Sequence, residues 1–423
     1  MIIKEKSMLV ISVTDKKFQK TINLPASKSE SNRVLIIEAL AKFQQGSTML
    51  GKYQIENISA ARDTQTMLKL LESQENTLDV LDAGTTMRFL TAFCAITRRK
   101  VVLTGTPRMQ ERPIKILVDA LSHLGANIRY LQKIGFPPVE IIDFEQKTNK
   151  VSIEGNVSSQ YISALLMIAP LLEKGLELHL KNQITSKPYI QMTLELMELF
   201  GVHYEWQENT IFVSAGKYKL KNYTIEADWS AASYWYSIVA LAEVGTTLFL
   251  PYLKKNSLQG DSIIAKIMQF FGVATVYQEK GIEIKKISEP QTNIFAYDFS
   301  DCPDLAQTIV ALCVGKGICL HATGLESLRI KETDRIAALA KEVAKLGFIF
   351  TDINEKKWVL QPVSPLAKHQ TAIIETYEDH RMAMAFAPLT MCLPVGIENE
   401  QVVEKSYPNF WEELQKIATI VKR

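Results

Sequence analysis

The sequence predicts a mixed α/β (α+β) protein of two domains, each an inside-out α/β barrel of three βαβαββ repeats. Two recurring features lead to this fold class. Apolar segments that follow a polar cluster recur along the chain, the last four intervals measuring 72 to 76 residues, with starts near Ser29, Thr85, Ser159, Ala231, Asp304 and His380. Glycines that end helix-like segments recur at a similar interval: Gly125, Gly201, Gly272 and Gly347.

Composition places this chain among globular proteins without a membrane span. It has 423 residues, 47% of them hydrophobic, and a net charge of +2, which favours neither nucleic acid nor a membrane surface as a partner. No apolar run approaches the roughly 18 residues of a span, and residues 1–10 contain no signal core. The five Cys and six His are scattered without metal-ligand or disulfide spacing. We therefore expect a cytoplasmic protein with no metal site.

The first repeat begins with a strand that leads into a capped helix. We expect a strand over 21–24 that Pro25 ends, and Ser27 and Glu30 have the S-x-x-E spacing of a capping box. The first N–H groups of such a helix have no intrahelical partner, so its start can bind an anion. The alternative is an ordinary surface helix with solvated charges. Three polar residues belong to this start: Lys28, Ser29 and Arg33.

Each later repeat has the same order of elements. The first helix is apolar nearly all round, as in 159–172 and 231–242, which predicts burial within a layer. A short strand, a polar loop, a second helix ending at glycine and a returning hairpin follow. The first repeat is cut short, because only a few residues separate Leu71 from the strand at Leu78.

The chain crosses between the domains twice, just before Ser27 and near 226–228. The first domain is therefore predicted to comprise residues 26–227, and the second residues 1–25 together with 228–423. Domains of about 200 residues are within the usual range. We expect the active site in the cleft between them.

Chemically active residues gather at helix starts and at the loops before second helices. If the helices of a domain run parallel, these starts share a face, and two such faces would surround a multiply anionic ligand with positive helix ends. Asp304 and Glu332 are candidate general acids or bases because they lie among cations. A structural salt bridge is the alternative for each. The cations are Lys28, Arg33, Arg112, Arg335, Arg381 and Lys405.

Seven ordered motifs resemble the enolpyruvyl transferase family of 3-phosphoshikimate 1-carboxyvinyltransferase, or 5-enolpyruvylshikimate-3-phosphate synthase. The resemblance covers nearly the whole chain. The motifs lie at residues 25–33, 83–88, 107–113, 158–160, 186–189, 331–335 and 379–384.

The resemblance implies transfer of the enolpyruvyl group of phosphoenolpyruvate to the 5-hydroxyl of shikimate 3-phosphate, on the route to chorismate and aromatic amino acids. It implies no metal or organic cofactor, and a monomer that is a glyphosate target. Asp304, Glu332 and Lys28 would be catalytic. Shikimate 3-phosphate would bind Lys28, Ser29, Arg33, Ser158, Ser159, Gln160, Ser186, Tyr189, Asp304 and Lys331. Phosphoenolpyruvate would bind Lys28, Gly84, Arg112, Gln160, Arg335, Arg381 and Lys405.

The sequence departs from the family pattern without losing a phosphate ligand or either carboxylate. The departures are Ala26, Arg62, Asp82, Phe89 and Ser327. Three other functions are alternatives. The enolpyruvyl transferase that acts on UDP-N-acetylglucosamine typically carries a cysteine in the loop that here spans 105–113, which has none. A non-catalytic phosphate sensor would lack a ligand or a carboxylate, and an RNA-end cyclase would be more basic.

Overall fold

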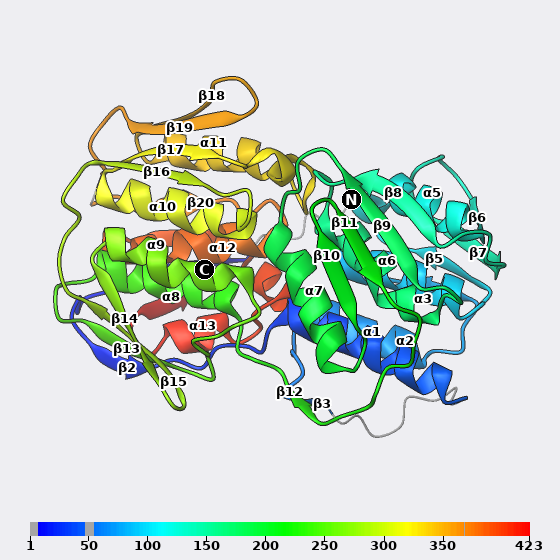
Figure 1. Ribbon diagram of the computed structural model, residues 1–423. Helices are drawn as coiled ribbons and strands as arrows, with labels where there is room; N and C mark the ends of the chain where they lie inside the picture. Colours follow the sequence, from blue (N-terminus) through cyan, green and yellow to red (C-terminus); the bar gives the residue numbers. More distant parts are fainter. Residues whose placement is uncertain (1–6, 47–54, 368) are drawn as a thin grey trace. The chain divides into compact units, whose positions relative to one another are not determined.

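The computed structural model describes residues 7–46, 55–367 and 369–423, which form a mixed α/β fold (Figure 1). The chain divides into two compact units. We name residues 26–225 the central unit, and residues up to 25 together with 226–423 the terminal unit. Among the described residues, no helix has both the length and the apolar character needed to cross a bilayer.

The helices of the central unit are α1 (Lys28–Gln44), α2 (Arg62–Glu72), α3 (Gly84–Ile96), α4 (Pro107–Gln110), α5 (Lys115–Leu124), α6 (Ser159–Ile168), η1 (Ala169–Leu171) and α7 (Lys187–Leu199). Those of the terminal unit are α8 (Trp229–Leu241), η2 (Gly260–Ile263), α9 (Ile264–Phe270), η3 (Pro303–Leu305), α10 (Ala306–Lys316), η4 (Glu326–Ile330), α11 (Arg335–Lys345), α12 (His380–Phe386), η5 (Ala387–Met391), η6 (Glu400–Lys405) and α13 (Phe410–Leu414).

The strands of the central unit form two four-stranded sheets and one two-stranded sheet within the described residues. The first, in spatial order, is β4 (Thr77–Asp79), β5 (Val101–Thr104), β7 (Val139–Phe144) and β6 (Ala126–Tyr130). The second is β8 (Lys150–Glu154), β9 (Leu176–Lys181), β11 (Thr210–Val213) and β10 (Tyr204–Gln207). The short one joins β12 (Tyr223–Thr224) to β3 (Ile55–Glu56).

The terminal unit contributes three four-stranded sheets in its described part. The first is β2 (Gln19–Thr21), β13 (Thr247–Pro251), β15 (Gly281–Lys286) and β14 (Val273–Gln278). The second is β16 (Ile294–Asp298), β17 (Cys319–Thr323), β19 (Lys357–Pro362) and β18 (Phe348–Asp352). The third is β20 (Ala372–Ile374), β21 (Val395–Glu398), β1 (Met8–Ser12) and β22 (Thr419–Lys422).

All the four-stranded sheets share one pairing pattern. Each begins with a parallel pair, such as β8 and β9, and continues into two antiparallel strands, such as β11 and β10. In the sheet that holds β1, the strand from the start of the chain takes the place that β11 has in the other unit. The sheets stay open, and none closes into a barrel in the part of the chain described here.

Just before each passage of the chain from one unit to the other, a strand pairs with the unit that precedes the passage. β2 precedes α1 of the central unit but pairs with β13, and β12 precedes α8 of the terminal unit but pairs with β3. The two chain crossings also meet, because the Asp228 N–H donates to the Pro25 carbonyl at 2.9 Å.

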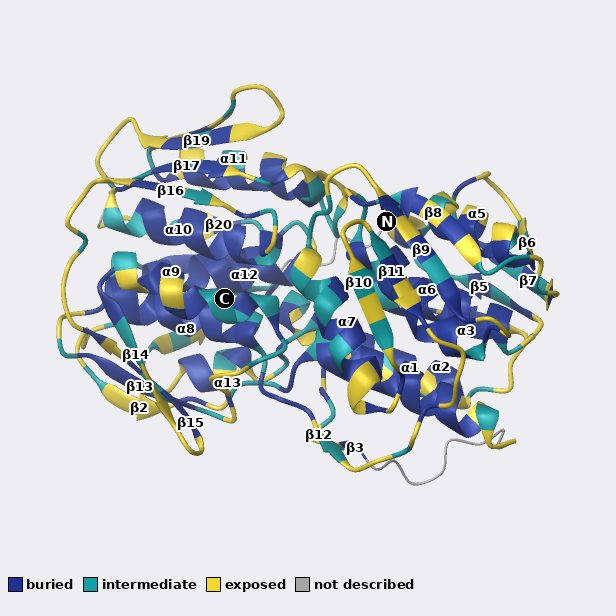
Figure 2. Ribbon diagram, viewed as in Figure 1, coloured by how far each residue is buried: buried dark blue, intermediate teal, exposed yellow. Residues whose placement is uncertain are grey.

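The first helix of each repeat is buried among the other first helices of its unit. Helices α1, α3 and α6 pack on one another in the central unit, and α10 packs on both α8 and α12 in the terminal unit. These helices are dark blue over most of their length in Figure 2. Their apolar character all round the helix is therefore explained by burial on every side.

Local sequence signals located most helix ends correctly. The first helices begin within two residues of the predicted starts. The four predicted glycines all have positive φ angles, from 73° to 127°, which a residue without a side chain adopts readily. A continuous helix over 159–172 is wrong, because Pro170 changes its last turn to a 3₁₀ helix. The strand predicted over 21–24 ends at Thr21.

Candidate functional site

The first turn of α3 brings together three segments of the central unit. Arg112 lies directly against Gly84, because a Cβ at residue 84 would stand only 2.7 Å from Arg112 Nη2. The next residue, Thr85, accepts a hydrogen bond from Gln160 Nε2 at 3.1 Å. The absence of a side chain at residue 84 is thus what lets the Arg112 guanidinium approach this helix start.

Lys28 is connected to the first turn of α3 through Asp63. Its Nζ lies 3.1 Å from Asp63 Oδ2, and the Asp63 carboxylate is buried at the start of α2. The Asp63 carbonyl in turn accepts a hydrogen bond from Thr86 Oγ1 at 3.3 Å. The starts of α1, α2 and α3 are therefore joined, and the predicted residues Lys28, Gly84, Arg112 and Gln160 lie in one connected set.

Arg88 braces the segment that carries Arg112. Its Nη1 donates to the Gly84 carbonyl at 3.1 Å and its Nη2 to the Pro113 carbonyl at 2.8 Å. The Tyr161 hydroxyl donates to the same Pro113 carbonyl at 2.5 Å. Because Pro113 follows Arg112 in the chain, these bonds restrain the backbone from which the Arg112 side chain extends.

Arg33 is buried among protein acceptors, so its start of α1 is not a solvated surface helix. Its Nε donates to Thr193 Oγ1 at 2.7 Å and its Nη1 to the Ser29 carbonyl at 2.8 Å. Its Nη2 lies 3.3 Å from both Ser163 Oγ and the Tyr189 carbonyl. Burial lowers the pKa of Arg33 to about 10. In this structure the guanidinium ties α1 to α6 and α7.

The remaining predicted residues of the central unit lie at helix starts. Ser158 caps α6 by accepting from the Gln160 N–H at 3.4 Å, and Ser159 begins that helix. Ser186 precedes α7 with a left-handed φ of 53°, and Tyr189 lies in its first turn. In α6 the Gln160 and Tyr161 N–H groups already donate to Ser158. In α7 Pro188 has no N–H, and the Tyr189 N–H donates to the Ser186 carbonyl. Serine hydroxyls at both starts can still donate to an anion.

In the terminal unit, one fully buried carboxylate organises two arginines. Asp379 caps α12, and its Oδ1 accepts from the Arg381 N–H at 2.8 Å. Its Oδ2 accepts from Arg335 Nε at 2.7 Å. Arg335 Nη2 also donates to Glu332 Oε2 at 2.9 Å, so three charged residues surround the start of α11.

Asp304 lies among three cations. Its Oδ2 is 2.9 Å from Arg381 Nη2, and its Oδ1 is 3.1 Å from Arg335 Nη1 and 3.6 Å from Lys331 Nζ. Asp304 and Glu332, which were singled out as acid-base candidates, therefore share Arg335 as a partner. The predicted residues Asp304, Lys331, Glu332, Arg335 and Arg381 form one network.

Charge sets the protonation states of this network. Burial by itself would raise the pKa of Asp304, but Arg381, Lys331 and Arg335 together hold it well below its ordinary value. Burial would lower the pKa of Arg335, but Asp379, Glu332 and Asp304 raise it above its ordinary value. Asp304 is thus ionised and Arg335 protonated at any ordinary assay pH.

Lys405 is 1% exposed at the end of η6. That segment packs against α12, the helix that carries Arg381. The structure thus places Lys405 on the element next to the arginine with which it was predicted to act.

The sequence analysis assigned no role to two buried aspartates that belong to these networks. Asp63 binds Lys28, as described above. Asp261, in η2, accepts a hydrogen bond from the Ser230 hydroxyl, to which Arg381 Nη2 also donates at 3.5 Å. Both stand where the second helix of a repeat begins. The corresponding loops of other repeats supplied Arg112 and Lys331, so this repeated position was a usable signal.

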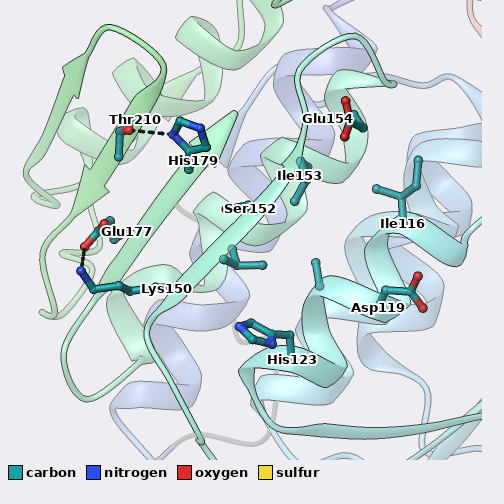
Figure 3. A pocket seen from close by; sticks show the side chains of 12 residues that line it. Ile116, Asp119, His123, Lys150, Ser152, Ile153, Glu154, Glu177, His179 and Thr210 are labelled. Atoms are coloured by element: carbon teal, nitrogen blue, oxygen red, sulfur yellow. Dashed lines mark hydrogen bonds and ion pairs between the residues drawn. The ribbon is translucent and has the colours of Figure 1, made fainter. Parts of the chain in front are cut away.

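A separate cavity of about 720 Å³ lies in the central unit between α5 and the strands β8, β9 and β11 (Figure 3). Lys150 and Glu177 form an ion pair there at 2.6 Å, and His179 lies 3.1 Å from Thr210 Oγ1. None of the predicted site residues lines it. Across the residues described, no group of three or more His, Cys, Asp or Glu side chains is arranged to hold a metal ion.

Comparison with known protein families gives one match over most of the chain. The family model described as EPSP synthase (3-phosphoshikimate 1-carboxyvinyltransferase) matches residues 49–414. A 3-phosphoshikimate 1-carboxyvinyltransferase of Bacteroides fragilis (strain YCH46) is 47% identical, covering 95% of this chain and 96% of its own. One of Haemophilus influenzae (strain Rd) is 35% identical, covering 94% and 96%.

Two solved structures share the fold. An EPSP synthase from Acinetobacter baumannii superposes with a TM-score of 0.78 at 20% identity, covering 99% of this chain and 100% of its own. The enolpyruvyl transferase NikO from Streptomyces tendae gives 0.72 at 12% identity, with 99% of each chain covered. At these identities the likeness establishes the fold alone.

Proposed function

The chain belongs to the family of EPSP synthases (3-phosphoshikimate 1-carboxyvinyltransferases), and on that premise we propose how its two units divide the reaction between them. The enzyme transfers the enolpyruvyl group of phosphoenolpyruvate to the 5-hydroxyl of shikimate 3-phosphate in the shikimate pathway. The observation that carries the proposal is the network around Asp304. In it, the three carboxylates Asp304, Glu332 and Asp379 all pair with Arg335.

The two units are proposed to be the two three-repeat domains, with residues 26–227 in one and residues 1–25 and 228–423 in the other. The common pairing pattern of the four-stranded sheets supports a six-fold βαβαββ repeat. The short sheet of β3 and β12, together with α1 and α2, is the truncated first repeat. In each domain the buried first helices are proposed to be the inside of the inside-out barrel, with the open sheets outside them.

Phosphoenolpyruvate is proposed to bind residues of both units. In the central unit the support is the convergence of Arg112, Gly84 and Gln160 at the start of α3, next to Lys28. In the terminal unit it is the placement of Arg335 and Arg381 at the starts of α11 and α12, and of Lys405 on η6, which packs against α12. Guanidinium groups suit this ligand, because they bind carboxylate and phosphate oxygens in pairs.

Shikimate 3-phosphate is proposed to bind mainly the helix starts of the central unit. Their serine hydroxyls and the Gln160 amide can bind a phosphate and ring hydroxyls, and Lys28 and Arg33 add positive charge. The terminal unit adds one carboxylate for the 5-hydroxyl. The proposed ligands are Lys28, Ser29, Arg33, Ser158, Ser159, Gln160, Ser186, Tyr189, Asp304 and Lys331.

Asp304 is the proposed proton acceptor, with Glu332 and Lys28 completing the acid-base set. The addition step places a proton on the vinyl carbon and removes one from the attacking hydroxyl, and the elimination step takes a proton back from that carbon as the bond to phosphate breaks and phosphate leaves. An anionic substrate would share Arg381 and Arg335 with Asp304. Their hold on the carboxylate would then weaken and its pKa would rise, so substrate binding itself makes Asp304 a stronger base.

Phosphate release tests the proposal. The purified protein should release phosphate only when phosphoenolpyruvate and shikimate 3-phosphate are both present. UDP-N-acetylglucosamine replaces shikimate 3-phosphate as the control acceptor and should give no turnover. Turnover with the nucleotide sugar, or phosphate release without any acceptor, would contradict the assignment of the acceptor site.

Three further sequence-based expectations stay predictions. They are a cytoplasmic location, a monomeric state, and activity without an added metal ion or organic cofactor. Light scattering coupled to size-exclusion chromatography measures the second, and dialysis against a chelator before the assay measures the third.

A further inference from the structure

A buried carboxylate in the terminal unit lies one hydroxyl away from a proposed substrate arginine. Asp261 is 3% exposed and accepts a hydrogen bond from the Ser230 hydroxyl. Arg381 Nη2 donates to that same hydroxyl at 3.5 Å. Arg381 also donates to the Tyr234 hydroxyl at 3.4 Å and contacts Asp304. The three residues Asp261, Ser230 and Arg381 thus form a linear series of contacts.

The hydroxyl has only one proton, and this fixes the direction of the series. An ionised carboxylate can only accept hydrogen bonds, so Ser230 must donate its proton to Asp261. The lone pairs of Ser230 Oγ then remain for Arg381. A neutral carboxyl at residue 261 could donate instead, and the Ser230 hydroxyl would then be free to rotate away from the arrangement that accepts from Arg381.

We propose that Asp261 is a positioning residue for Arg381, acting through the Ser230 hydroxyl to hold the guanidinium where phosphoenolpyruvate binds. This inference rests on the proposed role of Arg381 as a ligand of that substrate. Asp261 itself touches Ser230 and is assigned no contact with the substrate or the reacting atoms.

Several charged or titratable groups face Asp261 from the surrounding elements. Asp304 comes from η3, Arg381 from α12 and Asp228 from the N-cap of α8, and the Cys302 thiol also feels its charge. Burial, aided by Asp304, raises the pKa of Asp261 to about 6, although Arg381 and the Ser230 hydrogen bond oppose this. The carboxylate therefore changes its charge within a pH range in which the enzyme can be assayed.

Steady-state kinetics of five variants test the inference. Asp261→Asn and Ser230→Ala should each raise the KM for phosphoenolpyruvate about three- to tenfold, the usual effect of one lost hydrogen bond to a charged group. The KM for shikimate 3-phosphate should stay unchanged and kcat should change less than about threefold. Ser230→Thr, which keeps the hydroxyl, should restore the wild-type value.

Ser233→Ala is the matched control. Ser233 lies one turn further along α8, and its hydroxyl donates to the Ser230 carbonyl and contacts Thr308, so the variant removes a buried hydroxyl of the same helix without touching Arg381. It should behave as the wild type. If Asp261→Asn folds poorly, Ser230→Ala tests the same contact from a less buried position.

The pH profile supplies a readout that a purely structural role would not move. In the wild type and in Ser233→Ala, the KM for phosphoenolpyruvate should rise as the pH falls through about 6, because Asp261 takes up a proton. Asp261→Asn should lack this component. Titration of the substrate phosphate is the same for all variants, so it cancels in the comparison.

Arg381→Lys distinguishes the proposed substrate role of Arg381 from the positioning role of Asp261. If it raises the KM for phosphoenolpyruvate while Asp261→Asn and Ser230→Ala do not, the positioning role is overturned and the substrate role of Arg381 stands. If Arg381→Lys leaves that KM unchanged, the proposed role of Arg381 fails, and the inference about Asp261 fails with it.

Discussion

Arg33 in the central unit and Arg335 in the terminal unit are equally buried, but their partners differ in charge. Arg33 donates to hydroxyl and carbonyl oxygens, and burial lowers its pKa to about 10. Burial acts on Arg335 in the same direction, yet carboxylates, Asp379 foremost, raise its pKa above the ordinary value. Burial alone therefore does not determine the pKa of these arginines. The charge of their hydrogen-bond partners determines whether it falls or rises.

The comparison suggests a division of labour between the units. The central unit offers hydroxyls and cations to a ligand, and with the exception of Lys28 these groups are proposed to orient anions without moving protons. The terminal unit places three carboxylates around Arg335, and a carboxylate can exchange a proton when a ligand changes its surroundings. Loss of a terminal-unit carboxylate should thus reduce turnover, whereas a change in the central unit should chiefly reduce binding.

Asp304→Asn should have the largest effect. It removes the proposed proton acceptor but keeps its size, so kcat should fall by roughly two to four orders of magnitude while shikimate 3-phosphate still binds. Asp301→Asn, an exposed neighbour on the same loop, is the control. A loss of less than about fivefold in kcat, with binding unchanged, would remove Asp304 from proton transfer.

Gly84→Ala tests the central unit and should have an intermediate effect. The new methyl group would stand 2.7 Å from Arg112 Nη2, so the guanidinium must shift. The KM for phosphoenolpyruvate should rise about ten- to a hundredfold, and more than the KM for shikimate 3-phosphate. Inhibition by glyphosate should weaken as well.

Gly216→Ala is the matched control for that substitution, because a Cβ there meets nothing within 4 Å. It should leave both KM values unchanged. Equal rises for the two substrates in Gly84→Ala would mean that residue 84 supports the start of α3 and does not border the site of phosphoenolpyruvate.

Asp261→Asn should have the smallest of these effects. It acts on the stability of the fold, and unlike the losses of activity above it is a gain. Because the folded state raises the pKa of Asp261 to about 6, it binds more protons than the unfolded state between about pH 4 and 6. Stability contributed by this group therefore falls as the pH rises through that window. The variant should be more stable than the wild type at pH 7.5 by about 1–3 kcal/mol, and the difference should vanish near pH 4.

Thermal unfolding midpoints at the two pH values measure this difference. A variant that is less stable at pH 7.5 would show that the ionised carboxylate stabilises the fold. Asp261 would then be a structural group of the terminal unit that stabilises the fold. It would not be a carboxylate retained at a cost in stability.

Local patterns in the sequence predicted the helix starts and the glycine ends, because caps and left-handed turns depend on residues close together in the chain. Pairings between distant residues were harder to predict. Glu30 fitted a capping box, yet its side chain accepts from the Tyr223 hydroxyl at 2.7 Å. The burial of Arg33 depends on Thr193 and Tyr189, which lie on α7, far along the chain.

The candidate residues of each unit were found from their positions at helix starts and from the family resemblance. Asp379 belongs to one of the family motifs, but its hydrogen bond with Arg335 could not be predicted from the sequence, because the two residues lie 44 positions apart. Beyond their repeated position, Asp63 and Asp261 carried no distinguishing signal, because an aspartate in the first turn of a helix is equally typical of a surface charge at the positive helix end.

The central claim is that one ligand engages residues of both units, and small-angle scattering tests it most directly. Without ligand, two sets of cations and positive helix ends should repel each other, and an anion should reverse that interaction. The radius of gyration should decrease at saturating shikimate 3-phosphate and low salt, and much less with unphosphorylated shikimate. An unchanged radius with the phosphorylated substrate would contradict the claim.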